Sequence, residues 1–179
     1  YAVIYLAAVI PSYMEEYNPE SYIKTNIVGT YHVLEYCRRV HADRILFSTT
    51  VFDISLFATD GTVLKPDLPY NFSYKGDHAV YVITKNTAIE LLEHYHQEYG
   101  LKKFVFRFPT IYSYSPYHYY FPNGKKTLRP VYRMIELAMK GEPIELWGNP
   151  DYSKDMVHVY DCAQMLCEAV EADREEGFY

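Results

Sequence analysis

Short apolar runs alternate with longer segments of mixed polarity along this chain of 179 residues. Residues 2–7, 44–48 and 103–108 are largely apolar and rich in β-branched and aromatic side chains, which predicts strands buried on both faces of a parallel sheet. Residues 143–147 have a similar character and predict a further strand. Residues 109–125 carry prolines, serines and tyrosines and are predicted to be irregular.

The segments between these runs have helical periodicity. Within residues 19–40 apolar side chains recur at steps of three and four, and Pro19 suits a first helical turn. Residues 78–99 give the clearest helix, and Gly100 predicts its end because glycine readily adopts the left-handed conformation of a helix cap. Two further helices are predicted at residues 128–140 and 160–172.

The order strand, helix, strand, helix, strand predicts an α/β fold with a doubly wound parallel sheet. In such sheets ligands bind beyond the carboxyl ends of the strands. Thr50, Tyr81 and Thr110 all lie at or beyond such ends in the predicted arrangement. We therefore expect the functional site at the carboxyl edge of the sheet.

The composition is that of a globular protein, with 49% apolar and 22% charged residues. The formal net charge of −6 argues against a nucleic-acid partner, since phosphate binding needs a basic surface. No apolar run approaches the roughly 20 residues that span a bilayer, so no membrane partner is predicted. The three cysteines, Cys37, Cys162 and Cys167, form no Cys-x-x-Cys pair, which favours free thiols and a cytoplasmic location.

Tyr81 and Lys85 belong to the segment Y-V-I-T-K on the predicted helix 78–99. Residues four apart lie on one helix face, so the Lys85 ammonium is predicted to lie near the Tyr81 phenol. A nearby cation lowers the pKa of a phenol from about 10 and lets it exchange a proton with an alcohol. The same spacing also arises by chance in a chain with 21 tyrosines, so the context decides its interpretation.

A cluster of hydroxyl residues, Ser48, Thr49 and Thr50, follows the second predicted strand. A hydroxyl at this point could hold a substrate oxygen and share its proton with Tyr81. The same residues could also do no more than cap a strand end. Both interpretations stay open from the residues alone.

Several blocks resemble the extended short-chain dehydrogenase/reductase family, the group that contains NAD-dependent nucleotide-sugar epimerases and dehydratases. The blocks are YLAA at 5–8, NIVGT at 26–30, RILFSTT at 44–50, YVITK at 81–85, RFPTIYS at 107–113 and GEPIELWGNPDYSKDMVHVYD at 141–161. Each block alone is a weak signal, but together they cover nearly the whole chain in the family's order. The resemblance implies a partial Rossmann-like sheet together with part of a small substrate-binding subdomain.

The resemblance also implies a catalytic set. Tyr81 would be the general acid/base, and Lys85 would hold the nicotinamide ribose and tune Tyr81. Thr50 would orient the substrate hydroxyl, with Thr49 as the alternative if the register shifts by one. These roles follow from matching positions in the family's motifs.

The implied cofactor is NAD, with NADP not excluded. Besides Tyr81 and Lys85, Asn26 would help to place the cofactor through a link to Lys85. Ala7 and Ala8, at the end of the first predicted strand, would lie beside the cofactor. The implied partner is a nucleotide-sugar substrate, and family members often form homodimers, which we expect here as well.

Substrate contacts are implied for Thr110, Lys154 and His158. Thr110 stands where many family members have asparagine, and Lys154 stands where an arginine commonly grips phosphate. Lysine can pair with phosphate, but as a point charge without the two-pronged fork of arginine. His158 and Asp161 match the family's late motif, and Asp161 is expected to cap the final helix.

The resemblance implies two parts: residues 1–112 as the C-terminal half of a Rossmann-like NAD-binding domain, and residues 113–179 as mostly substrate-binding segment. The family's G-x-x-G-x-x-G turn, which cradles the pyrophosphate, has no counterpart among the eight glycines. We therefore expect the sequence to be a fragment shortened at both ends. These residues alone are expected to bind NAD weakly and to turn over little.

The first functional hypothesis is an NAD-dependent nucleotide-sugar 4-epimerase. A sugar-nucleotide 4,6-dehydratase or a reductase is an alternative, although dehydratases usually have Asp-Glu after the catalytic threonine, where Val51 and Phe52 stand here. A non-catalytic binding or assembly module is the alternative from another class. No metal is expected, because His94 and His96 would point to different sides of their helix.

Overall fold

A computed structural model of the protein describes residues 1–11, 18–58, 62–146, 149, 151 and 155–179. Its centre is a parallel sheet of four strands in the order β1, β2, β3, β8. The bounds of these strands are Ala2–Tyr5 for β1, Arg44–Thr50 for β2, Lys102–Phe108 for β3 and Glu176–Phe178 for β8. The predicted strands at 2–7, 44–48 and 103–108 are confirmed with shifted ends. Because β2 extends to Thr50, both candidate threonines lie inside the strand.

The predicted helix at 19–40 forms as three consecutive pieces: α1 (Pro19–Tyr22), the π-helix η2 (Ile23–Val28) and α2 (Gly29–Arg39). A π-helical stretch inside a longer helix is often found at functional sites. The predicted helix at 78–99 forms as α3 (Asp77–Tyr99), and it ends at Gly100 with φ of 67°.

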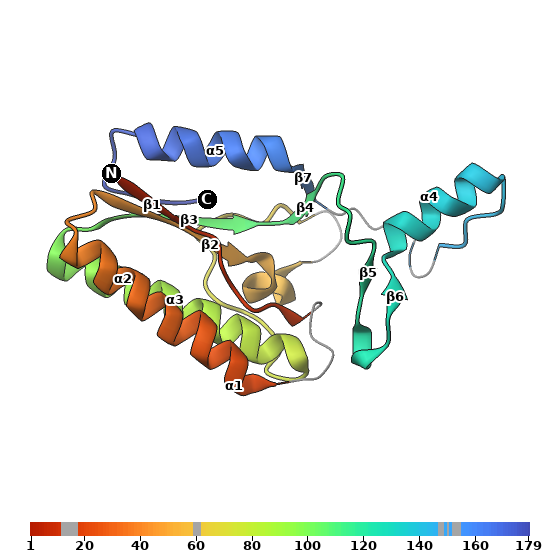
Figure 1. Ribbon diagram of the computed structural model, residues 1–179, viewed down its shortest axis with the longest axis horizontal. Helices are drawn as coiled ribbons and strands as arrows, with labels where there is room; N and C mark the ends of the chain where they lie inside the picture. The colour runs from red at the N-terminus through yellow and green to blue at the C-terminus, as the bar shows by residue number, and fades with distance from the viewer. Residues whose placement is uncertain (12–17, 59–61, 147–148, 150, 152–154) are drawn as a thin grey trace.

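Helices cover both faces of the sheet (Figure 1). Helices α2 and α3 lie on one face, and α5 (Val159–Glu171) lies on the other. The first face buries Leu34, Cys37, Ile45, Phe47, Ala88, Leu92, Tyr95 and Val105. The second face buries Leu46, Phe104, Phe106, Leu166 and Ala169. Alternating side chains of β2 thus enter two separate cores, which explains why its run is continuously apolar.

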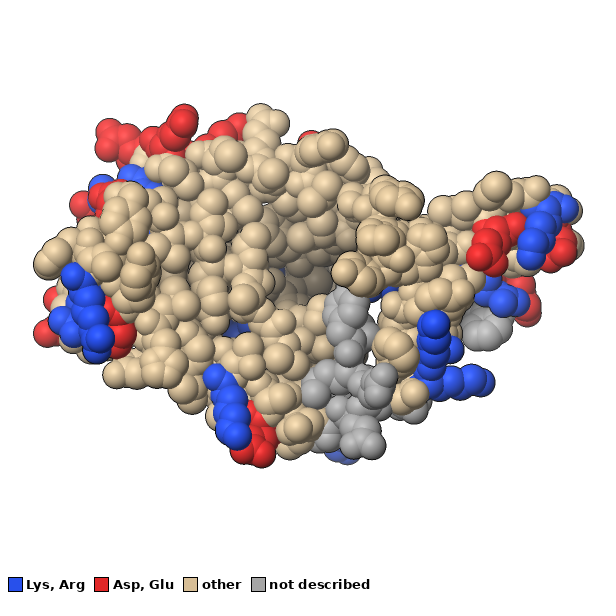
Figure 2. Space-filling model, viewed as in Figure 1, with Lys and Arg blue, Asp and Glu red and all other residues tan. Residues whose placement is uncertain are grey.

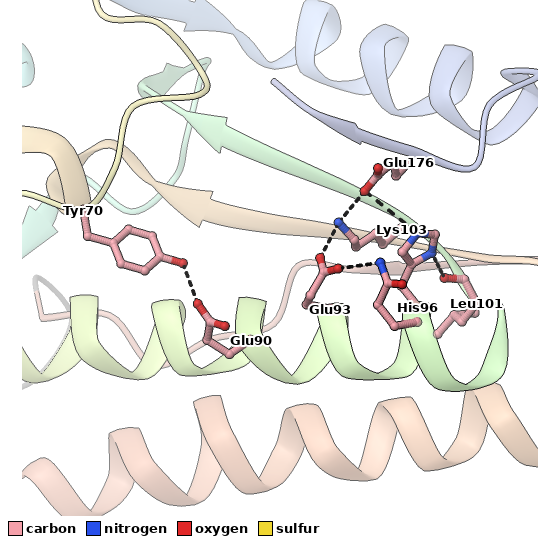
Figure 3. A network of polar contacts seen from close by, with 8 residues as sticks. Tyr70, Glu90, Glu93, His96, Leu101, Lys103 and Glu176 are labelled. Atoms are coloured by element: carbon pink, nitrogen blue, oxygen red, sulfur yellow. Dashed lines mark hydrogen bonds and ion pairs between the residues drawn. The ribbon is translucent and has the colours of Figure 1, made fainter.

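Polar contacts tie α3 to the far edge of the sheet (Figure 3). Lys103 of β3 lies between two carboxylates, 2.7 Å from Glu93 of α3 and 2.6 Å from Glu176 of β8. His96 Nδ1 lies 3.0 Å from the carbonyl oxygen of Leu101 at the turn into β3. The contact with Glu176 joins β3 to a strand that is distant in sequence.

Outside the main sheet, the chain forms short elements. They are the 3-10 helices η3 (Val51–Phe57) and η4 (Pro122–Gly124), the parallel pair β4 (Thr110–Tyr112) and β7 (Met156–His158), the antiparallel pair β5 (Tyr119–Tyr120) and β6 (Thr127–Leu128), and α4 (Pro130–Lys140). Helix α4 buries none of its side chains and lies away from the main sheet (Figure 1).

Several features differ from the sequence-based expectation. Residues 109–125, predicted to be irregular, contain the short strands β4 and β5 and the 3-10 helix η4. The strand predicted at 143–147 is wrong: residues 142–146 have no regular secondary structure and are exposed, and Trp147 lies outside the described residues. No described strand lies alongside to pair with this segment, and an unpaired apolar run has no reason to be a strand. Strand β8 was not predicted, because its three residues are too few to form a pattern.

The division of the chain at residue 112 remains a prediction. Helix α5 and strand β8 follow that position in sequence but belong to the main sheet and its cover.

Among the described residues, no helix is both long and apolar enough to cross a membrane. In the same residues, no group of three or more histidine, cysteine or acidic side chains is placed to hold a metal ion.

Candidate active site

Tyr81 lies in the second turn of α3, where the helix passes the carboxyl ends of β2 and β3. Its side chain is buried with Tyr22, Phe72 and Val82, which come from α1, the loop after η3 and α3 itself. The Tyr22 ring centre lies 6.5 Å from that of Tyr81. Three separate parts of the chain therefore enclose one phenol.

Thr50 is the last residue of β2 and the N-cap of η3. Its Oγ1 accepts a hydrogen bond from the backbone N–H of Phe52 at 3.3 Å, and its side chain lies close enough to the Tyr81 phenol to lower the pKa of that group. The neighbouring Thr49 hydroxyl is buried and has no hydrogen-bond partner among the described residues. The structure thus brings Thr50, rather than Thr49, to Tyr81.

The pKa of Tyr81 is raised above its usual value near 10, mainly because burial disfavours the phenolate. The nearby Thr50 hydroxyl lowers the pKa, and the negative charge of Asp53 raises it further. The expectation that Lys85 lowers this pKa is wrong for the structure, because Lys85 is not among the groups that act on the phenol. At neutral pH Tyr81 is therefore a protonated phenol, able to donate.

Lys85 lies one turn after Tyr81 and is only 2% exposed. Its Nζ lies 4.0 Å from the centre of the Phe47 ring of β2, within the range of a cation–π interaction. Burial lowers the pKa of Lys85 to about 7. The ammonium is thus only partly charged at neutral pH, which explains its small effect on Tyr81.

Asn26 lies in the π-helix η2 and joins two other segments. Its Oδ1 accepts from the Val9 N–H at 2.9 Å, and its Nδ2 donates to Val9 O at 3.1 Å and to Thr84 Oγ1 at 3.0 Å. Thr84 Oγ1 in turn donates to the Tyr81 carbonyl at 2.8 Å. Asn26 therefore connects the chain after β1 to the turn of α3 that carries Tyr81. Its side-chain hydrogen bonds to described residues do not include one to Lys85.

The remaining predicted residues lie at two places. Ala7 and Ala8 follow β1, with Ala7 exposed and Ala8 half-buried. Thr110 begins β4, and His158 ends β7, which pairs with β4. Lys154 lies outside the described residues.

His158 is also the N-cap of α5, since its Nδ1 accepts from the Tyr160 N–H at 3.4 Å. The expectation that Asp161 caps this helix is wrong. Asp161 lies in the first turn, where its carboxylate interacts favourably with the positive end of the helix dipole.

The sequence interpretation missed one pair beside this site. Asp53 of η3 and Arg107 of β3 form a buried ion pair, with Arg107 Nη2 3.0 Å from Asp53 Oδ2. Burial raises the pKa of Asp53, and the guanidinium opposes that rise. The available signal was an arginine inside an otherwise apolar strand, since a buried charge needs a partner.

The surface is hollowed next to this region (Figure 2). The hollow lies between the body of the main sheet and the segment that carries β4 to β6, and the carboxyl ends of β2 and β3 point toward it (Figure 1). This is the place where ligands bind in doubly wound sheets.

Residues 1–178 match the NAD dependent epimerase/dehydratase family. The chain belongs to this family. Its four-stranded parallel sheet with helices on both faces is the corresponding Rossmann-like fold. Members of the family are enzymes that use NAD.

Similar curated proteins include epimerases and dehydratases. The UDP-glucuronate 4-epimerase of Thermodesulfobacterium geofontis is 27% identical over 163 residues, which cover 91% of this chain and 46% of that protein. The dTDP-glucose 4,6-dehydratase of Salmonella typhimurium is 28% identical over 192 residues, covering 92% of this chain and 46% of that protein. The chain thus spans a little under half the length of these relatives.

Solved structures agree on the fold. The UDP-glucose 4-epimerase of Thermotoga maritima, solved with UDP-glucose, superposes with a TM-score of 0.71 and 27% identity, covering 99% of this chain and 54% of that one. The UDP-glucose 4-epimerase of Thermus thermophilus, solved with NAD, has a TM-score of 0.74, 22% identity and coverage of 98% and 54%. At 22% identity, the similarity to the Thermus thermophilus enzyme shows the fold alone.

Proposed function

We propose that this chain carries the catalytic residues of an NAD-dependent nucleotide-sugar 4-epimerase. The observation that carries the proposal is the contact between the buried Tyr81 phenol and the Thr50 hydroxyl, at the carboxyl ends of parallel strands in a member of this family. A phenol and a hydroxyl in this arrangement are the groups needed to hold a sugar hydroxyl and to move its proton.

In this proposal Thr50 Oγ1 orients the reacting hydroxyl of the sugar, and Tyr81 Oη exchanges a proton with it. Tyr81 is a proton donor as it stands, because burial keeps its pKa high. To accept a proton, the phenol needs a nearby full positive charge that lowers its pKa. Tyr81 packs with Tyr22, Phe72 and Val82, and such buried surroundings strengthen any such charge effect.

The donor set fits NAD. Lys85 is a buried ammonium that makes no ion pair among the described residues, and the Thr49 hydroxyl is buried without a partner, so both are suited to ribose hydroxyls. Lys85 and Tyr81 would hold the ribose beside the nicotinamide, with Ala7 and Ala8 beside the cofactor. When bound, NAD supplies the acceptor and donor of hydride.

Epimerisation is favoured over dehydration by the surroundings of Thr50. Loss of water needs an additional acid and base near the substrate, but Val51 and Phe52 follow Thr50. The next acidic residue, Asp53, is fully buried and held by Arg107, so it is not free to act on a substrate. The proposed substrates are nucleotide sugars such as UDP-glucose and UDP-glucuronate, which similar proteins act on.

A homodimer, a cytoplasmic location and substrate contacts from Thr110, Lys154 and His158 remain predictions.

The test incubates the full-length protein with NAD and either UDP-glucose or UDP-glucuronate, and follows the configuration at C4 by NMR. We expect the 4-epimer to form, and Tyr81→Phe to abolish its formation while NAD binding is kept. Tyr99→Phe, a half-exposed tyrosine about 27 Å further along α3, is the matched control and should be fully active. Formation of a 4-keto-6-deoxy sugar would instead indicate a dehydratase, and full activity of Tyr81→Phe would remove the proposal.

A further inference from the structure

Asp53 and Arg107 are joined by an ion pair almost closed to solvent, with side chains 0% and 4% exposed. Arg107 Nε and Nη2 both donate to Asp53 Oδ2, at 3.2 and 3.0 Å. The guanidinium also lies over the Phe178 ring of β8, 4.7 Å from its centre. Separating such a pair would leave an uncompensated charge in the interior, so the pair resists separation. It therefore fixes η3 against β3.

The same pair holds the chain that follows η3. Arg107 Nη1 donates to the carbonyl oxygen of Pro66 at 2.7 Å, and the carbonyl oxygen of Asp53 accepts from the Asn71 N–H at 2.7 Å. The Asn71 carbonyl accepts from the Leu56 N–H at 3.0 Å. Pro66 and Asn71, two points of this loop, are thus attached to the residues of one buried pair.

Thr50 stands at the entrance to the segment that the pair holds. Its Oγ1 accepts from the Phe52 N–H, one residue before Asp53, and its side chain reaches Tyr81. Arg107 is the register partner of Thr49 in the main sheet. Movement of Asp53 away from Arg107 would therefore shift the turn that orients the Thr50 hydroxyl.

We infer that Asp53 and Arg107 are positioning residues, which hold the Thr50 hydroxyl against Tyr81 and so fix where a substrate hydroxyl is held. The catalytic consequence rests on the proposed function. Both side chains are nearly closed to solvent, at 0% for Asp53 and 4% for Arg107, so neither is placed to touch a substrate in this arrangement. Their effect passes through Thr50.

The functional test is a double-mutant cycle on turnover in the full-length protein. Asp53→Asn should lower kcat about tenfold with KM changed less than about twofold, because orientation rather than binding is lost. In a Thr50→Val background Asp53→Asn should have no further effect on kcat, because the hydroxyl that Asp53 helps to position is already absent. The inference is wrong if the effects of Asp53→Asn and Thr50→Val on kcat multiply in the double variant. It is also wrong if Asp53→Asn changes only KM.

The second test does not depend on activity. Amide hydrogen exchange at Phe52 and Asn71 should accelerate at least about tenfold in Asp53→Asn, because the turn is released. Unchanged exchange at Phe52 would overturn the inference even if the protein has no epimerase activity. If Tyr81→Phe is fully active, the proposed function fails. The hydrogen-exchange result at Phe52 then still decides whether Asp53 and Arg107 hold the turn beside Thr50.

Asp43→Asn is the matched control. Asp43 also joins β2 and β3 by ion pairs, to Arg44 at 2.7 Å and Lys102 at 3.0 Å, but at the opposite ends of these strands. It should change neither kcat nor exchange at Phe52. Arg107→Lys is the second variant if Asp53→Asn does not fold, because it keeps the charge but loses the two-nitrogen fork; the same pattern is expected from it.

Discussion

The Nζ atom of Lys85 lies 4.0 Å from the centre of the Phe47 ring, in the core between α3 and β2. A cation–π contact recovers part of the stabilisation that an ammonium loses when it leaves water. Burial still dominates, and it lowers the pKa of Lys85 to about 7. The charge of this residue therefore changes within the neutral pH range, and that change is measurable without any substrate.

Lys85 should make the folded protein more stable as pH rises from about 7 toward 10.5. In that window the unfolded chain holds a proton on Lys85 that the folded chain does not, so raising the pH favours folding by up to ~1.4 kcal/mol per unit. Lys85→Met removes this contribution. Urea unfolding between pH 6 and 9 should give a shallower rise of the free energy of unfolding in Lys85→Met than in the wild type.

The control for this prediction is Lys140→Met, which alters an exposed lysine at the end of α4. Its pH dependence should match that of the wild type. Equal slopes in the wild type and Lys85→Met would show that Lys85 stays charged in its buried position.

The two threonines at the end of β2 should differ in their effect on turnover. Thr50→Val removes the hydroxyl beside Tyr81 and should lower kcat at least about tenfold, whereas Thr50→Ser should keep most of the activity. Thr49→Val should have the smaller effect on kcat and should not lower stability, because its buried hydroxyl has no partner to lose. A larger loss in Thr49→Val than in Thr50→Val would show that the register is shifted by one.

The regular elements near the site were predictable because their signals are local. A continuous apolar run indicates β2, and a periodic pattern closed by Gly100 indicates α3. Tyr81 and Lys85 share one helix, so their common burial under the sheet follows from their spacing. The fold class follows from the order of these elements.

The electrostatics of the site could not be predicted in the same way. Whether Lys85 lowers the pKa of Tyr81 depends on burial by Tyr22 and Phe72, which come from segments distant in sequence. The pairing of Asp53 with Arg107 likewise depends on how η3 folds back over β3. Such contacts are set by tertiary packing, which the spacing of residues along the chain does not reveal.

Asn26→Ala should destabilise the protein by about 2–4 kcal/mol, since it leaves buried partners unsatisfied at Val9 and Thr84. Thermal or urea unfolding measures the loss. Asn86→Ala is the control, because Asn86 is a buried asparagine whose Oδ1 has no partner among the described residues. A loss in Asn86→Ala as large as in Asn26→Ala would mean that volume, rather than the hydrogen bonds, determines the effect.

The network around Lys103 should contribute to stability mainly at neutral pH (Figure 3). The hydrogen bond from Lys103 holds the pKa of Glu93 below its ordinary value of 4.5. Because the folded-state pKa is depressed, the contribution is complete above 4.5 and is lost as pH falls through the folded-state pKa. Glu93 is 44% exposed, so solvent screening limits the contribution to about 1 kcal/mol or less.

Glu93→Gln should therefore lower the free energy of unfolding at pH 7 and have a smaller effect at pH 3, because the contribution of the charged carboxylate falls as the pH is lowered. Urea unfolding at the two pH values measures the difference. Glu98→Gln, an exposed position on the same helix, should have little effect at either pH. An equal loss at both pH values would mean that Glu93 acts through packing of its methylene groups against α3, because packing does not depend on the charge of the carboxylate.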